Sequence, residues 1–278
     1  MEKRAGGIGG SYSNALWSHE FPVRPVLKEL DSISELKFDY LELTMDPPQA
    51  HYKMIRKEKK NLLRALDRHK MKIMCHLPTF VSTADLTPSL REASLNEVLN
   101  SLDVAAELEC LKVVLHPSYM LGLSKFVREK AREYALESLD AIMIKANQLG
   151  LIICLENMFS RTHSLVKPDD FVEIFEKFPK LKLTLDTGHA HIGDKDGRRT
   201  LDFIKRFPDR ISHIHASDNL GKEDNHLPVG AGTVNFPEIV KAIKEIGYDD
   251  TITLEVFSKD RDYLRISREK LETMFAVL

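Results

Sequence analysis

The sequence lacks the features of membrane proteins, of strongly basic nucleic-acid binders and of disulfide-rich secreted proteins. Its 278 residues contain no apolar stretch near the ~18 residues that span a membrane. The net charge is −2, from 40 basic and 42 acidic residues, so no overall positive field attracts nucleic acid. This balance does not exclude a local basic patch. The three cysteines are an odd number, and two lie inside apolar runs, so we expect a reduced, cytoplasmic protein.

The sequence also has no evident linker or leader. No long Pro/Gly/Ser-rich segment or low-complexity tract divides it, so we expect a single domain over residues 1–278. The N-terminal MEKRAGGIGGSYSN carries charge without a following apolar segment, which argues against a signal peptide. With 43% hydrophobic and 29% charged residues, the composition is that of a globular protein that can bury a sizeable core.

Short, nearly continuous apolar runs alternate with segments of helical periodicity. Such runs are typical of strands that are buried on both faces of a parallel sheet. We expect strands at residues 38–44, 71–76, 111–116, 151–156, 181–186, 211–215 and 251–255. We expect helices at residues 57–70, 89–109, 125–149, 169–178, 200–207, 236–246 and 263–276, with glycine directly after two of them as a stop signal.

These segments make seven β/α units, and an eighth is expected at the N-terminus. Its strand lies near residues 4–11, where glycine weakens the strand signal, and its helix spans about residues 25–36. Eight units of this length predict an α/β protein of the (β/α)8 TIM barrel class. An open doubly wound sheet is the main alternative, but GGIGGS precedes no convincing helix and is a poor dinucleotide-binding loop.

Six of the apolar runs end on a side chain that can bind a metal, at intervals of 40, 40, 30, 29 and 40 residues. In a parallel barrel these ends meet at one rim, where active sites of this fold lie. DTGH and DNH add three more candidates nearby. The nine candidates are His76, His116, Glu156, Asp186, His189, His215, Asp224, His226 and Glu255. Imidazoles and carboxylates without thiolates suit zinc, manganese, iron or cobalt, and argue against a closed structural zinc site.

Each of these side chains also has an ordinary structural explanation. A histidine or aspartate at a strand end can cap a helix or satisfy a turn. A whole ring of bare carboxylates and imidazoles would be costly without a cation. His213 lies two residues from His215, and we expect His215 to be the ligand and His213 to be structural. Glu42 faces either a substrate hydroxyl or a buried hydrogen-bond partner, and Trp17 could line the barrel floor, the pocket or a subunit contact.

The segments CHLPTF, VVLHPSY, CLENMF, LDTGHAHIGD, HIHASDN, DNHLPVGAGTVNF and TLEVF occur in the order found in a known superfamily. Together they resemble the xylose-isomerase-like TIM barrels (AP endonuclease family 2), which include endonuclease IV and the D-tagatose 3-epimerase-like sugar isomerases. The resemblance implies one to three divalent metal ions, with zinc or manganese expected. It assigns a four-ligand centre to Glu156, Asp186, His215 and Glu255. His76 and His116 would hold a second ion with Glu156, and His189, Asp224 and His226 a third.

Departures from the nuclease pattern concern recognition. TMDPP follows the second strand without the arginine-bearing DNA loop of endonuclease IV, LDTGH replaces LDTCH, and HASDN lacks the nuclease lysine. DNHLPVGAGTVNF looks more like the corresponding loop of sugar isomerase relatives. We therefore expect a metal-dependent isomerase or epimerase that acts on a small-molecule sugar or sugar phosphate. The resemblance implies that the catalytic acid/base pair is Glu156 and Glu255.

Two other functions stay open. The first is an endonuclease IV-like AP endonuclease that hydrolyses phosphodiesters in abasic DNA with two or three metal ions. The number of ligands favours it, and we expect two or more metal positions in either case. Its basic rim is thin and consists of Lys125, Arg161, Lys195, Arg198, Arg199 and Lys222. The second is a non-catalytic, metal-storing or scaffold barrel.

Overall fold

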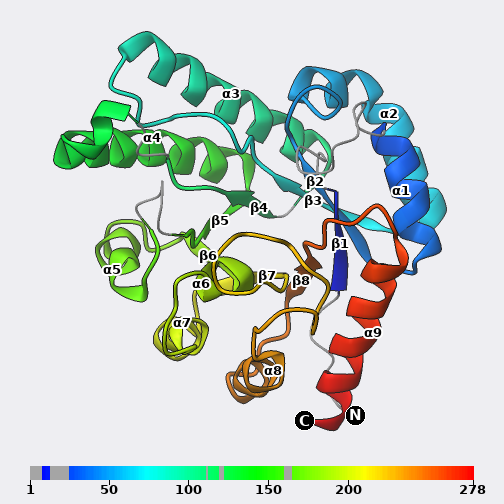
Figure 1. Ribbon diagram of the computed structural model, residues 1–278. Coiled ribbons are helices and arrows are strands. Elements are labelled where there is room, and N and C mark those ends of the chain that lie inside the picture. The colour runs from blue at the N-terminus through cyan, green and yellow to red at the C-terminus, as the bar shows by residue number, and fades with distance from the viewer. Residues whose placement is uncertain (1–7, 13–24, 111, 119–121, 160–164) are drawn as a thin grey trace.

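The computed structural model describes residues 8–12, 25–110, 112–118, 122–159 and 165–278. Eight parallel strands pair in chain order and close into a barrel (Figure 1). They are β1 (Ile8–Tyr12), β2 (Tyr40–Thr44), β3 (Lys72–His76), β4 (Lys112–Leu115), β5 (Ile152–Glu156), β6 (Lys182–Asp186), β7 (Ile211–Ala216) and β8 (Thr251–Leu254). The TIM barrel expected from the sequence is confirmed.

Helices surround the strands and connect each one to the next (Figure 1). They are α1 (Val26–Glu35), α2 (Tyr52–His69), α3 (Pro88–Glu107), the 3-10 turn η1 (Gly122–Lys125), α4 (Arg128–Leu149), α5 (Pro168–Lys177), α6 (Thr187–His191), α7 (Arg199–Arg206), α8 (Phe236–Glu245) and α9 (Asp262–Val277). Most begin and end within one or two residues of the expected bounds.

Two helix predictions needed correction, and one short helix was missed. Helix α2 begins at Tyr52 rather than at residue 57, because the His51 ring accepts a hydrogen bond from Lys53 N (3.4 Å) and caps it. Helix α4 begins at Arg128, since residues 122–125 form η1 instead. The short α6 was not predicted. The first strand lies at residues 8–12, near the expected position, while Trp17 falls outside the described residues.

Strand alternation decides which side chains enter the barrel. On β5, Ile153 and Leu155 pack into the main hydrophobic core with the helices, so Cys154 and Glu156 face the other way. The same alternation recurs around the barrel. As a result the last inward-facing side chain at the end of each strand from β3 to β8, or directly after it, lies at the mouth, and it is the metal-binding type noted in the sequence.

Two further observations bear on the sequence expectations. Within the described parts of the chain, none of the helices is both long and apolar enough to cross a membrane. Cys75, Cys110 and Cys154 are buried free thiols.

Candidate metal centre at the mouth of the barrel

The nine candidate side chains lie together at the carboxyl ends of the strands. Six come from the ends of strands β3 to β8 or from the residue directly after them, one from α6 and two from the loop after β7. We call them the mouth cluster: His76, His116, Glu156, Asp186, His189, His215, Asp224, His226 and Glu255. Contacts of 2.9 to 3.7 Å connect all of them into one group.

Three carboxylates of the mouth cluster converge on one ring nitrogen. His215 Nδ1 lies 3.5 Å from Glu156 Oε1, 3.7 Å from Asp186 Oδ2 and 3.3 Å from Glu255 Oε1. The three carboxylates come from β5, β6 and the end of β8, on both sides of β7. This is the group that the family resemblance assigned to a shared ion.

Glu156 lies between this group and a second one. Its Oε2 atom is 3.5 Å from His76 Nε2 and 3.1 Å from His116 Nε2, while its Oε1 atom faces His215. Ligand atoms of His76, His116 and Glu156 all lie within 4.8 Å of one another, as do those of Glu156, Asp186 and His215. A single carboxylate can therefore contribute one oxygen to each group, as a ligand that bridges two ions does.

The third group is centred on Asp224. Its Oδ2 atom lies 3.2 Å from His189 Nε2 and 2.9 Å from His226 Nε2. His189 Nδ1 is also 3.1 Å from Glu156 Oε1, which joins this group to the other two. The mouth cluster is thus continuous from His76 to His226.

Backbone carbonyls fix three of the imidazoles. His76 Nδ1 donates to the Leu77 carbonyl (2.8 Å), His189 Nδ1 to that of Asn157 (2.9 Å) and His226 Nδ1 to that of Glu255 (3.1 Å). Because a carbonyl can only accept, Nδ1 carries a proton in each ring and Nε2 faces the cluster, where the neutral ring offers its lone pair. Metal-ligating histidines are oriented in this way by their other ring nitrogen.

Several buried atoms of the mouth cluster have no hydrogen-bond partner among the described residues. They are both carboxylate oxygens of Glu156, Asp186 Oδ2, Asp224 Oδ1, His215 Nδ1 and His116 Nδ1. Buried charged oxygens left in this state are strongly unfavourable unless a cation or donor satisfies them. Nitrogen and oxygen donors a few ångströms apart fit zinc or a similar ion, whose bonds to them are ~2.0–2.2 Å long.

The protonation of the cluster reflects this crowding. Burial opposes ionisation of Glu156, but the nearby His116 and His215 rings outweigh it and hold the pKa of this carboxyl well below its usual range. Burial, with added repulsion from Glu255 and Glu156, raises the pKa of Asp186 to about 7. The pKa values of these two neighbouring carboxyls are thus shifted in opposite directions, as occurs at functional sites.

The loop after β7 is built to present Asp224 and His226. Asp218 Oδ1 accepts from Val234 N (3.0 Å) and its Oδ2 from Gly230 N (2.9 Å), which ties the two ends of the loop together. A side chain at Gly232 would collide with the Asn219 carbonyl oxygen, so only glycine fits there. His226 has a φ of 45°, a conformation that non-glycine residues adopt mainly where the surroundings impose it.

Two supporting residues were missed or left open by the sequence. Asn157 accepts from Asp186 N (2.8 Å) and donates to Asp186 O (3.0 Å), which clamps the ends of β5 and β6 together. The sequence signal that could have identified Asn157 was its position directly after Glu156. Glu42, whose role was left open, and His213, expected to be structural, lie below the mouth cluster and bind each other (2.9 Å).

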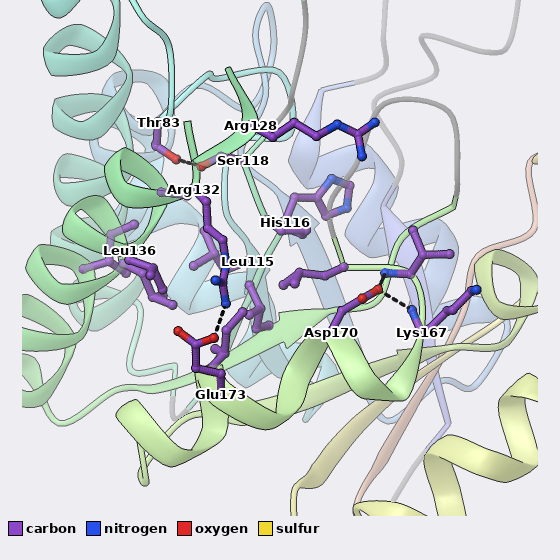
Figure 2. A pocket seen from close by; sticks show the side chains of 18 of the residues that line it. Thr83, Leu115, His116, Ser118, Arg128, Arg132, Leu136, Lys167, Asp170 and Glu173 are labelled. Carbon is purple, nitrogen blue, oxygen red and sulfur yellow. Dashed lines mark hydrogen bonds and ion pairs between the residues drawn. The ribbon is translucent and has the colours of Figure 1, made fainter. Parts of the chain in front are cut away.

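A cavity of about 750 Å³ lies beside His116, between α4 and α5. Figure 2 shows His116 among the residues that line it, with Arg132 paired to Glu173 (2.6 Å) and Thr83 hydrogen-bonded to Ser118. Its lining is partly apolar and includes Leu136. This volume is in the range of small-molecule sites, and it adjoins the candidate metal centre.

The rim of the barrel carries few of the basic side chains expected for a nucleic-acid binder. Lys125, Lys195, Arg198 and Lys222 are exposed, whereas Arg199 donates to the Ile192 carbonyl (3.0 Å). Arg161 lies outside the described residues.

The chain as a whole is similar to proteins of a known family. Residues 30–276 match the family described as the xylose isomerase-like TIM barrel. The protein belongs to this family. The resemblance stated from the sequence motifs is thereby confirmed.

Relatives of this family member fall in both branches. MJ1311, an uncharacterized protein of Methanocaldococcus jannaschii, is 31% identical over 259 residues, covering 87% of this chain and 86% of that protein. A probable endonuclease 4 of Aquifex aeolicus is 24% identical over 246 residues, covering 82% and 86%. A D-psicose 3-epimerase of Agrobacterium fabrum is 26% identical over 267 residues, covering 91% and 85%.

Among solved structures, a D-tagatose 3-epimerase-like protein matches with a TM-score of 0.83 at 26% identity, covering 98% of this chain and 97% of that one. The sequence identities alone do not separate the epimerase and endonuclease branches.

Proposed function

We propose that this protein is a divalent-metal-dependent isomerase or epimerase that acts on a small sugar or sugar phosphate. The observation that carries the proposal is the approach of Glu156 and Glu255 to one point. From β5 and the end of β8 they lie 3.5 and 3.3 Å from His215 Nδ1. Two carboxylates that meet from different sides of a small site suit proton transfer to and from a carbon atom between them.

The residues that would hold the ion are Glu156, Asp186, His215 and Glu255. Zinc or manganese suits these donors. When bound, such a cation supplies Lewis-acid polarisation of a ketose carbonyl, which makes the neighbouring C–H bond more acidic.

The two glutamates would then move the proton. Glu156, whose pKa is held well below the usual range, is ionised and can accept the proton from the carbon beside the carbonyl. The electron pair of that C–H bond moves toward the carbonyl. Glu255, when protonated, returns a proton to the opposite face and inverts the carbon. Such acid/base catalysis typically contributes a factor of ~10²–10⁴ to the rate.

The remaining members of the mouth cluster would bind the substrate. His76, His116, His189 and His226 direct nitrogen atoms toward the centre and can hydrogen-bond hydroxyls or a phosphate. The cavity beside His116 offers room for the rest of a sugar. The D-psicose 3-epimerase and the D-tagatose 3-epimerase-like protein among the relatives support this class of substrate.

Proton exchange tests the proposal on many sugars at once. A panel of ketoses and ketose phosphates is incubated with the manganese- or zinc-loaded protein in D2O, and NMR follows deuterium at the carbon beside the carbonyl. We expect exchange with at least one sugar. It should be lost in Glu156→Gln and Glu255→Gln and kept in Glu58→Gln, which alters an exposed carboxylate on α2. An absence of exchange across the panel contradicts the proposal.

A phosphodiesterase that acts on abasic DNA is the second candidate. The observation that favours it is the continuity of all nine ligand candidates, since one ion needs only four of them. Glu156 would bridge two ions, and the Asp224 group would hold a third. Incision of an abasic-site duplex in zinc or manganese, abolished by Glu156→Gln, would establish this function in place of the sugar chemistry.

A further inference from the structure

A charged side chain lies buried inside the barrel, directly beneath the mouth cluster. Glu42, on β2, is fully buried. Its Oε1 atom lies 3.0 Å from His215 Nε2, and its Oε2 atom lies 2.9 Å from His213 Nε2. The Thr253 hydroxyl donates to the same Oε2 atom. A buried carboxylate is tolerated only with such a set of partners.

These contacts determine which nitrogen of His215 carries a proton. A carboxylate only accepts hydrogen bonds, so Nε2 of His215 donates to Glu42. In the neutral ring this leaves a lone pair on Nδ1, the atom that faces Glu156, Asp186 and Glu255. A lone pair that faces three carboxylates is repelled by them unless a cation lies between. His215 Nδ1 has no hydrogen-bond partner among the described residues.

His213 holds Glu42 in place from the other side. Its Nε2 atom binds Glu42, and its Nδ1 atom lies 2.7 Å from Thr251 Oγ1. Both nitrogens are therefore used within the barrel, and neither faces the mouth. The two histidines of ISHIHA therefore have different roles. His215 is a candidate metal ligand, and His213 holds Glu42, the carboxylate that orients His215.

We propose that Glu42 is a positioning residue that fixes the His215 ring with Nδ1 toward the metal and strengthens Nδ1 as a ligand. The inference rests on the metal-dependent function proposed above. Carboxylates that accept from the second nitrogen of a metal-bound histidine fix its tautomer and raise its basicity. Loss of such a partner typically weakens metal affinity ~10–100-fold.

The test substitutes Glu42→Gln, which keeps the shape of the side chain and removes its charge. Glutamine can accept from one ring but must donate to the other, so one histidine loses its present tautomer. We expect manganese and zinc affinities, measured by competition with a chelator, to fall ~10–100-fold. In the metal-free protein, at a pH high enough to leave the His215 ring neutral, nitrogen-15 NMR of the histidine rings should show its proton on Nε2 in the wild type and a changed tautomer population in the variant.

Thr253→Val is the matched control. It removes a hydrogen bond to the same carboxylate without touching His215, so it should lower thermal stability while the metal affinity stays within about twofold of wild type. If Glu42→Gln also lowers stability but leaves metal affinity and the His215 tautomer unchanged, the positioning role is refuted. A wild-type protein that binds metal but exchanges no sugar proton would remove the proposed function and leave this role intact.

Discussion

Two polar clusters lie one above the other in the same barrel, and they differ in how their hydrogen bonds are satisfied. The lower one, the interior cluster, consists of Tyr40, Glu42, His213, Thr251 and Thr253. Its charged member Glu42 has three donors around it, and both His213 nitrogens have partners. In the mouth cluster, by contrast, buried oxygens of three carboxylates form no hydrogen bond among the described residues, although imidazole nitrogens come within 3.1 Å of Glu156.

This difference distinguishes a polar cluster that stabilises the fold from one that forms a functional site. Polar groups buried only to hold the fold together are normally paired, because an unpaired one costs folding free energy. A cluster left unsatisfied within an otherwise well-paired barrel indicates that another component completes it. The interior cluster then acts as the frame, and the mouth cluster as the site that a cation would fill.

The largest expected effect is on stability when the interior cluster is broken. Glu42→Ala leaves His213 and His215 without their shared acceptor and should cost ~3–5 kcal/mol of unfolding free energy, as loss of one partner of a buried pair does. The neutral substitution Asp186→Asn in the mouth cluster should cost far less in the metal-free protein, since it removes a carboxylate that repels Glu156 and Glu255. Urea unfolding of both variants measures this contrast. Equal losses of unfolding free energy in the two variants would contradict it.

The next effect is the stabilisation of the mouth cluster by a cation. Zinc or manganese at about 100 times the dissociation constant should add ~2.7 kcal/mol by mass action. The melting temperature should rise by roughly 5–10 °C, given ~2–4 °C per kcal/mol for chains near this size. Thermal unfolding with and without a chelator tests this. A melting temperature unaffected by either metal would mean that the cluster is satisfied in some other way.

A smaller effect is a pH dependence in the metal-free protein. Burial opposes protonation of His76, but Glu156 outweighs it and raises the pKa to about 9. A raised histidine pKa stabilises the fold fully below its unfolded value of 6.5, and this contribution is lost as pH rises through about 9. Unfolding in chelator should therefore become easier between pH 6.5 and 9, and His76→Asn should flatten that slope.

Metal affinity should change in the opposite direction over the same pH range, because the ligands must lose their protons to bind. Stability in chelator that rises across this range would contradict the protonation assigned to His76.

Much of the site could be predicted because it depends on local periodicity. Inward-facing residues at the ends of parallel strands must meet at one rim, so the convergence of His76, Glu156 and Asp186 followed from strand spacing alone. Their role as metal ligands stays a prediction. That the chain forms one domain also stays a prediction.

What the sequence could not predict depends on contacts between distant segments or on single caps. Glu42 and His213 are 171 residues apart and meet across the barrel interior, so the pattern around Glu42 left two roles open. Helix α6 has fewer residues than any periodicity can reveal, and it begins because Asp186 Oδ1 accepts from His189 N (2.6 Å). Gly188 there faces Ser217, where a side chain would meet the hydroxyl at 2.5 Å.

Anomalous diffraction from crystals of the manganese- or zinc-loaded protein, with elemental analysis of the same sample, tests the central claim most directly. We predict at least two ions in the mouth cluster, one of them bound by Glu156, Asp186, His215 and Glu255. A single ion with the His189, Asp224 and His226 corner empty would contradict the prediction of several ions. The absence of any ion from the mouth cluster would contradict the metal centre itself, and with it the proposed chemistry.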